Sequence, residues 1–220
     1  MNPKTDFSIR PFLGGFDKNF TYLITCSQTK CNIIIDAAIP VDQILPFISN
    51  TPTALLITHT HSDHISYIDD YINAFPDLII FGHPESALIF KTSNFKPINH
   101  NQNFKIGHLM FRTIHTPGHY FDSICYLLDP ALFTGDTLFV GRTGRVKSQK
   151  SDIQKLYNSI YNKLLTLPIE LRIYPGHHYG KQPSMKIKDN IRISPLLRAK
   201  NLKDFIERMK EYESNRLSNN

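Results

Sequence analysis

The sequence predicts an α/β fold in which two β-sheets pack face to face and helices cover both outer faces, a four-layer αββα sandwich. Short apolar runs with the length of strands alternate with segments that have the spacing of amphipathic helices. These runs form two similar halves, each rich in strands, and the helices between and after them are placed to cover the sheets. A chain of 220 residues is also large enough to bury a substantial core in one domain.

The first half begins with a predicted hairpin over residues 20–36, whose strands are Phe20–Thr25 and Cys31–Ile35. Helices and strands then alternate along the chain. They are expected as a helix over 41–49, a strand over 54–57, a helix over 65–75, a strand over 78–81 and a short helix over 85–90.

The second half contributes the second sheet and the longer helices. Asp152 is expected to cap a long helix, and helical spacing from Leu202 to Met209 predicts a terminal helix. We interpret residues 1–220 as one domain with a short helical tail at about 186–220. The strands of this half are expected over 111–114, 124–128, 131–135 and 171–174.

The most informative motif is Thr58–His64 (THTHSDH), which follows a short apolar strand directly. Side chains on an extended strand repeat every two residues, so His59 and His61 point the same way. If the chain then turns into a helix, Asp63 and His64 face a second position nearby. Imidazole and carboxylate ligands without a thiolate suit zinc, iron or manganese. The motif therefore predicts ligands for two adjacent metal ions, in preference to a solvated, histidine-rich turn.

Three further motifs share one context, an apolar strand that ends in glycine and a ligand-type residue. Glycine beside a ligand lets the backbone approach closely or adopt a positive φ. One loop cannot complete the shells of two metal ions, so these motifs are the expected source of the remaining ligands. They are Thr116-Pro117-Gly118-His119, Gly135-Asp136 and Pro175-Gly176-His177.

Together with Gly14–Phe20, these four motifs in this order resemble the metallo-β-lactamase fold superfamily of metallohydrolases. Within it, the chain resembles the branch of glyoxalase II (hydroxyacylglutathione hydrolase) and the persulfide dioxygenases. The resemblance covers nearly the whole chain and implies the same αββα sandwich. It also implies two divalent metal ions as cofactors, with zinc as first choice and iron or a mixed zinc/iron pair as alternatives. The implied ligands are His59, His61 and His119 for the first ion, Asp63, His64 and His177 for the second, and Asp136 as a bridge between them.

The resemblance implies a hydrolase of glutathione-type thioesters. A metal-bound hydroxide would attack the acyl carbonyl, and Asp63 is the expected catalytic residue that orients it. Glyoxalase II enzymes contact glutathione through a basic residue after the bridging aspartate and a tyrosine two residues past the last histidine. Arg145 and Tyr179 match these positions as substrate-binding residues. An arginine fork suits the carboxylates of glutathione, although Arg145 could instead pair with a carboxylate of its own loop.

Two features depart from the glyoxalase II pattern. Residues 178–220 are shorter than the C-terminal helical domain of full-length glyoxalase II, which supplies further basic contacts, and they look more like short relatives and persulfide dioxygenases. His178 stands where relatives commonly carry an acidic residue, so it either tunes the neighbouring site or faces outward.

The alternative function is a persulfide dioxygenase that holds one iron(II) through His59, His119 and Asp136. Two histidines and a carboxylate form the facial triad that leaves positions open for oxygen and substrate. Those enzymes tend to follow the arginine with Thr-Asp-Phe, whereas this chain has Val146-Lys147-Ser148, so the hydrolase is preferred. A nuclease would suit the positive charge, but RNA-processing relatives need an inserted domain for which this chain has no room. A non-catalytic binding module is disfavoured, because every ligand position is filled.

Composition sets the expected partners and compartment. The net charge of +6 and pI of about 9.2 suit a solvated surface or a funnel for a small anionic, thiol-derived substrate, and basic residues are not interleaved with aromatic ones as in nucleic-acid binders. Apolar runs are too short for a membrane span, and Met1–Asp6 lacks a secretory core. Three cysteines favour a reducing compartment. We therefore expect a cytoplasmic monomer or homodimer with no nucleic-acid or membrane partner.

Overall fold

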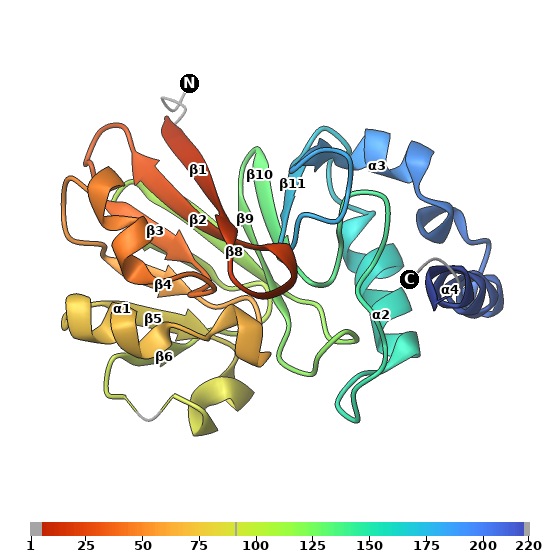
Figure 1. Ribbon diagram of the computed structural model, residues 1–220. Helices are drawn as coiled ribbons and strands as arrows, with labels where there is room; N and C mark the ends of the chain where they lie inside the picture. The colour runs from red at the N-terminus through yellow and green to blue at the C-terminus, as the bar shows by residue number, and fades with distance from the viewer. Residues whose placement is uncertain (1–5, 91, 218–220) are drawn as a thin grey trace.

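A computed structural model describes residues 6–90 and 92–217 of the chain. Two six-stranded sheets pack face to face, and helices lie on the outer side of each sheet (Figure 1). The predicted αββα sandwich is confirmed.

The N-terminal sheet has the strand order β1-β2-β3-β4-β5-β6. The first three strands are antiparallel, and β3, β4, β5 and β6 are parallel to one another. Parallel strands end at the same edge of a sheet, so the residues that follow β3 and β4 are brought together. The strands are β1 (Phe7–Gly14), β2 (Asn19–Cys26), β3 (Asn32–Ile35), β4 (Ala54–Leu56), β5 (Ile79–Gly82) and β6 (Phe95–Pro97).

The C-terminal sheet has the order β12-β11-β10-β9-β8-β7. Its neighbours pair antiparallel except for β10 and β11, which are parallel and therefore also end at one edge. The strands are β7 (Asn103–Ile106), β8 (Leu109–His115), β9 (Ile124–Leu128), β10 (Ala131–Gly135), β11 (Arg172–Pro175) and β12 (Met185–Lys186).

Longer helices cover the outer faces. On the side of the C-terminal sheet, α2 and α4 share one apolar cluster that includes Leu156 and Phe205. Asp152 caps α2 as predicted, because its Oδ1 accepts the backbone N–H of Lys155 at 2.9 Å. The helices are α1 (Ile68–Ala74), α2 (Ile153–Ser159, continued by a π-helix over Ile160–Leu164), α3 (Ile187–Ile193) and α4 (Leu202–Leu217).

Several predicted helices are shorter or tighter than expected. The segment 41–49 forms two separate 3₁₀ turns, since Pro46 has no N–H to continue a helix. The segment 85–90 is a 3₁₀ helix over Pro84–Leu88. The predicted helix over 65–75 begins only at Ile68, because residues 62–64 form a 3₁₀ turn of their own.

Two tyrosines tie the sheets together at the edge where the ligand motifs lie. Tyr22 of β2 donates its hydroxyl to the carbonyl of Pro175 at 2.6 Å, and Tyr126 of β9 donates to the carbonyl of Ile57 at 2.7 Å. Both rings are buried in the core between the sheets. The chain that follows Ile57 and the chain that follows Pro175 are thus held in register with each other. The polar motifs begin immediately beyond these two residues.

The described part of the chain contains no helix that is both long and apolar enough to cross a bilayer. Its three cysteines are free thiols, as expected.

Candidate metal centre and its pocket

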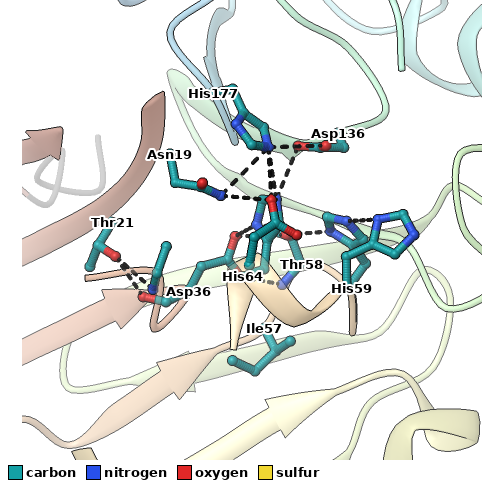
Figure 2. Close-up of polar contacts among 12 residues, drawn as sticks. Asn19, Thr21, Asp36, Ile57, Thr58, His59, His64, Asp136 and His177 are labelled. Atoms are coloured by element: carbon teal, nitrogen blue, oxygen red, sulfur yellow. Dashed lines mark hydrogen bonds and ion pairs between the residues drawn. The ribbon is translucent and has the colours of Figure 1, made fainter. Parts of the chain in front are cut away.

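The predicted ligands meet at one edge of the sandwich, where strands of both sheets end (Figure 2). The segment 58–64 follows β4 of the N-terminal sheet. From the C-terminal sheet, His119 follows β8, Asp136 follows β10 and His177 follows β11. Residues that lie far apart in sequence therefore converge because each one is placed at the end of a buried strand.

Three histidines form the first group. The Nδ1 of His61 lies 2.9 Å from the Nε2 of His59 and 2.9 Å from the Nε2 of His119. Three imidazole nitrogens that point at one another in this way present their lone pairs to a common point, as the ligands of a metal ion do.

The second group consists of Asp63, His64 and His177. The Nε2 of His177 lies 3.3 Å from the Nε2 of His64 and 3.3 Å from the Oδ2 of Asp63. Asn19 donates from its Nδ2 to the same Asp63 oxygen at 3.1 Å, which fixes the orientation of the carboxylate.

Asp136 lies between the two groups. Its Oδ2 is 3.4 Å from the Nε2 of His119 and 3.3 Å from the Nε2 of His177, and its Oδ1 is 3.3 Å from the Nε2 of His64. The Oδ1 atom is buried and accepts no hydrogen bond. A buried carboxylate oxygen without a donor is costly unless a cation satisfies it, so this donor set fits resident metal ions.

Hydrogen bonds outside the cluster fix which nitrogen of each ring faces inward. The Nδ1 of His119 faces the carbonyl of Arg145 at 2.9 Å, and the Nδ1 of His177 faces the carbonyl of Asp17 at 2.9 Å. A carbonyl only accepts, so each Nδ1 carries a proton and each Nε2 faces the cluster. The Thr58 hydroxyl donates to Asp36 at 2.7 Å and therefore accepts from the Nδ1 of His59, which lies 3.2 Å away. These outer partners therefore orient the rings for metal binding.

Asp36 organises the cluster without belonging to it. It follows β3 directly and is buried, and it accepts the backbone N–H and the hydroxyl of Thr58, each at 2.7 Å (Figure 2). Its Oδ2 also accepts the Nδ1–H of His64 at 2.8 Å. Asp36 is not among the residues predicted from the sequence. Its context, an isoleucine-rich strand that ends in an acidic residue, matches the context that identified the ligands and could have revealed it.

Comparison with known proteins places this arrangement in a family. The family model of the metallo-beta-lactamase superfamily matches residues 14–177, a span that includes every predicted ligand. The chain belongs to the metallo-beta-lactamase superfamily.

Relatives within the superfamily carry the names of hydrolases. The probable hydroxyacylglutathione hydrolase glo2 of Schizosaccharomyces pombe is 34% identical over 178 residues, which cover 76% of this chain and 66% of that protein. The chain thus spans just under two thirds of the length of this relative. The probable polyketide biosynthesis zinc-dependent hydrolase BaeB of Bacillus velezensis is 30% identical over 181 residues, covering 79% of this chain and 80% of that protein.

A solved member of the superfamily has the same architecture. The crystal structure of ETHE1 from Myxococcus xanthus superposes with a TM-score of 0.82 at 31% sequence identity, covering 92% of this chain and 90% of that one.

Burial and nearby charges divide the predicted ligands into two electrostatic classes. In the first group, burial lowers the pKa of all three histidines, to about 4 for His61, so these rings are neutral near pH 7 and able to bind a cation. In the second group burial acts in the same direction, but carboxylates outweigh it. Asp136 and Asp36 hold the pKa of His64 well above its usual value, and Asp136 is the main cause that raises the pKa of His177 to about 9.

Two glycines beside ligands are required by close packing, as predicted. Gly135 has a φ of 47°, and a Cβ at this position would lie 2.7 Å from the Cβ of Thr58. A Cβ on Gly176 would lie 2.3 Å from the Oδ1 of Asp136. A side chain at position 135 would therefore collide with Thr58, and one at position 176 with Asp136.

An open pocket of about 160 Å³ has the cluster as its floor. Arg142, Arg145 and Tyr179 line it, together with Phe139 of the same loop and Tyr212 of α4. Arg145 forms no ion pair with any described residue, so pairing with a carboxylate of its own loop is not observed there. Arg142 was not singled out from the sequence.

Tyr179 lines the pocket but is already engaged on two sides. Its hydroxyl donates to the Oδ2 of Asp17 at 2.6 Å, and its ring stacks on that of His177 with 4.8 Å between ring centroids. A substrate that reaches Tyr179 therefore meets the ring or the hydroxyl lone pairs.

Two other histidines near the site, His115 and His178, lie outside the ligand groups. His115 stacks on His83 at 4.0 Å and takes no part in the ligand groups, whereas His119 does. The ring of His178 packs 5.6 Å from that of Phe20 and does not line the pocket.

Proposed function

We propose that this chain is a metal-dependent hydrolase that cleaves glutathione-type thioesters. The observation that carries the proposal is the pocket itself, which has a cluster of candidate metal ligands as its floor. Its walls carry two arginines that form no ion pair with a described carboxylate. Similarity to a relative named as a probable hydroxyacylglutathione hydrolase supports it.

In this proposal His59, His61 and His119 hold one divalent ion, Asp63, His64 and His177 hold a second, and Asp136 contacts both. The bound ions would supply a nucleophile from water near neutral pH and polarise the acyl carbonyl. Zinc is our first choice, because the ligand set is nitrogen and oxygen and a relative is named as zinc-dependent. Iron suits the same ligand types and is the alternative.

The protein's own residues would hold the reactants in place. Asp63 has one carboxylate oxygen bonded to Asn19, and its side chain is 22% exposed toward the pocket it lines, which suits orienting a nucleophile. The thiolate that leaves needs little help from an acid. The guanidinium of Arg145 would bind a carboxylate of the thiol part, and Tyr179 would form the wall beside it.

The reaction class is tested with one substrate pair. Metal-loaded protein should cleave S-lactoylglutathione under strict exclusion of oxygen, with one free thiol formed for each thioester lost. The competing function is the persulfide dioxygenase, for which the proximity of Asp136 and His119 at 3.4 Å is the relevant observation. Stoichiometric oxygen uptake with glutathione persulfide, and no thioester cleavage, would decide for that function.

The role of Arg145 is tested by Arg145→Ala. An anion contact remote from the reacting carbonyl affects KM more than kcat. Loss of a charge-assisted hydrogen bond corresponds to about a ten- to hundred-fold drop in kcat/KM. We expect this drop for glutathione thioesters, with unchanged metal content and unchanged cleavage of a small neutral thioester. Equal losses for both substrates would show that Arg145 supports its loop and does not bind substrate.

A further inference from the structure

Arg142 occupies an unusual position in the pocket. Its guanidinium carbon lies 3.5 Å from the centroid of the Tyr179 ring and 5.5 Å from that of Phe139. The Tyr179 ring in turn lies parallel to the His177 ring, with an angle of 6° between them. If the guanidinium and the imidazole lay on the same face of the Tyr179 ring, they would overlap. They therefore lie on opposite faces of the ring. The stack thus has three layers, Arg142, Tyr179 and His177, and it reaches from the pocket wall to the cluster of candidate ligands.

The backbone that carries Arg142 is held firmly. The carbonyl of Arg142 accepts the N–H of Phe139 at 2.8 Å, which closes the loop on itself. Asn190 of α3 is fully buried and binds both sides of this loop, accepting the N–H of Gly141 at 2.7 Å and donating to the carbonyl of Phe139 at 2.8 Å. The guanidinium is therefore pre-positioned, and a ligand that binds it would lose little entropy in ordering the loop.

The stack uses the flat face of the guanidinium and leaves its N–H edge free. On that edge, Nη1 contacts the hydroxyl of Tyr212 at 3.5 Å. Arginine carries five N–H donors and stays charged at all physiological pH values. Most of the donors of Arg142 are therefore available to a ligand in the pocket.

The carboxylates that line the same pocket are engaged elsewhere. Asp17 accepts the hydroxyl of Tyr179, and Glu213 pairs with Lys147 at 3.0 Å. Asp63 and Asp136 belong to the ligand cluster. No described carboxylate lies within ion-pair distance of Arg142. A fixed guanidinium without a counter-ion in a concave site is suited to bind an anion.

We propose that Arg142 is a second anion-binding residue of the pocket and acts beside Arg145 to select thiol derivatives that carry two anionic groups. This inference rests on the proposed function for the identity of the reaction and adds a specificity-determining residue to it. The groups that suit two guanidinium forks are carboxylates or phosphates on the thiol-derived part of the substrate. Neutral thioesters would lack both contacts.

The test measures binding, so that it does not depend on turnover. Metal-loaded protein is titrated calorimetrically with S-methylglutathione, which has both carboxylates and no scissile bond, and with its dimethyl ester. S-methyl-coenzyme A serves as the phosphate-bearing probe. Arg142→Ala should weaken binding of the anionic probe that the wild type prefers by about ten- to a hundred-fold. Binding of the dimethyl ester should change much less.

Two further variants separate anion binding from folding. Arg142→Lys keeps the charge but loses the planar fork and the stack, so it should restore only part of the affinity. Arg10→Ala removes another stacked arginine, which lies over Phe47 at 4.2 Å and does not line the pocket, and should bind like the wild type. Each variant is checked for metal content and for its circular dichroism spectrum.

The outcomes are distinct. Unchanged affinity of Arg142→Ala for the anionic probes overturns the inference, and so does an equal loss for the dimethyl ester. If anionic probes bind through Arg142 but no thioester is cleaved, the inference holds and the proposed function fails. If thioesters are cleaved but anionic probes bind no better than the neutral one, the proposed function holds and the inference fails.

Discussion

At the scale of single residues, Asp136 differs from the other ligand candidates in how its two oxygens are used. One faces His64, and the other faces His119 and His177, so both groups depend on the same side chain. Asp136→Ala should therefore lower metal content at both positions, whereas His177→Ala should empty the second position preferentially. The metal-to-protein ratio after dialysis distinguishes the two variants. A full complement of metal in Asp136→Ala would contradict the bridging assignment.

Asp36 is expected to act on the second position through His64. Asp36→Asn keeps the shape of the side chain but removes the charge that holds the Nδ1–H of His64 at 2.8 Å. Loss of such an outer partner weakens metal affinity about ten- to a hundred-fold. Competition with a chromogenic chelator measures this, and Asp204→Asn at the half-buried start of α4, outside the ligand cluster, serves as a control. Wild-type affinity in Asp36→Asn would argue that Thr58 alone positions the ligand loop.

At the scale of elements, the loop after β10 depends on α3. Asn190 pairs with backbone groups of Gly141 and Phe139, and its removal would leave both without their partner. We expect Asn190→Ala to reduce the free energy of unfolding by ~2–4 kcal/mol, from the penalty for unpaired buried polar groups. Urea denaturation of the apo forms measures the change. Asn158→Ala, at an exposed position of α2, should change stability by less than about 0.5 kcal/mol. Similar effects for the two variants would mean that the loop holds its shape without α3.

The same elements show how far the sequence could predict the fold. Central strands such as β4 and β10 are continuous apolar runs, and both were expected. The edge strand β1 was not, because it mixes polar and apolar residues and contains Pro11, which only an edge tolerates well. The sequence predicts a helix over 41–49, where the structure has two 3₁₀ turns, since apolar spacing alone does not distinguish 3₁₀ from α geometry.

The candidate site, like the fold, could be predicted in part from the sequence. The candidate ligands could be predicted because each one lies in a local motif beside the end of a strand. The contacts of Asp17 and Arg142 could not be predicted, because both residues contact Tyr179, which is remote in sequence. No rule of residue spacing predicts contacts of this kind. The partners of Asn190 are equally remote in sequence.

At the scale of the whole molecule, the cluster joins the two sheets. His64 comes from the N-terminal sheet and His177 from the C-terminal sheet, and their Nε2 atoms lie 3.3 Å apart. An ion bound to both stabilises only the folded chain, by about 2.7 kcal/mol at a concentration one hundred times its Kd. Chelation should therefore lower Tm by roughly 5–10 °C for a protein of this size. Calorimetry with and without chelator tests this, and re-addition of the ion should reverse the shift. An identical Tm in both conditions would show that the sheets alone define the fold.

The pocket has one further property that matters for engineering. Its chemistry lies in residues 59–177, whereas Tyr212 and Glu213 of α4 form a part of the wall that comes from a later stretch of chain. Randomising those two wall positions would alter what enters the pocket without touching a single ligand. Phe205 and Met209, on the buried side of the same helix, would keep it docked on the sandwich. Laboratory evolution toward new thioesters would thus begin at the pocket-facing positions of α4, where substitutions change substrate preference and leave the reaction centre intact.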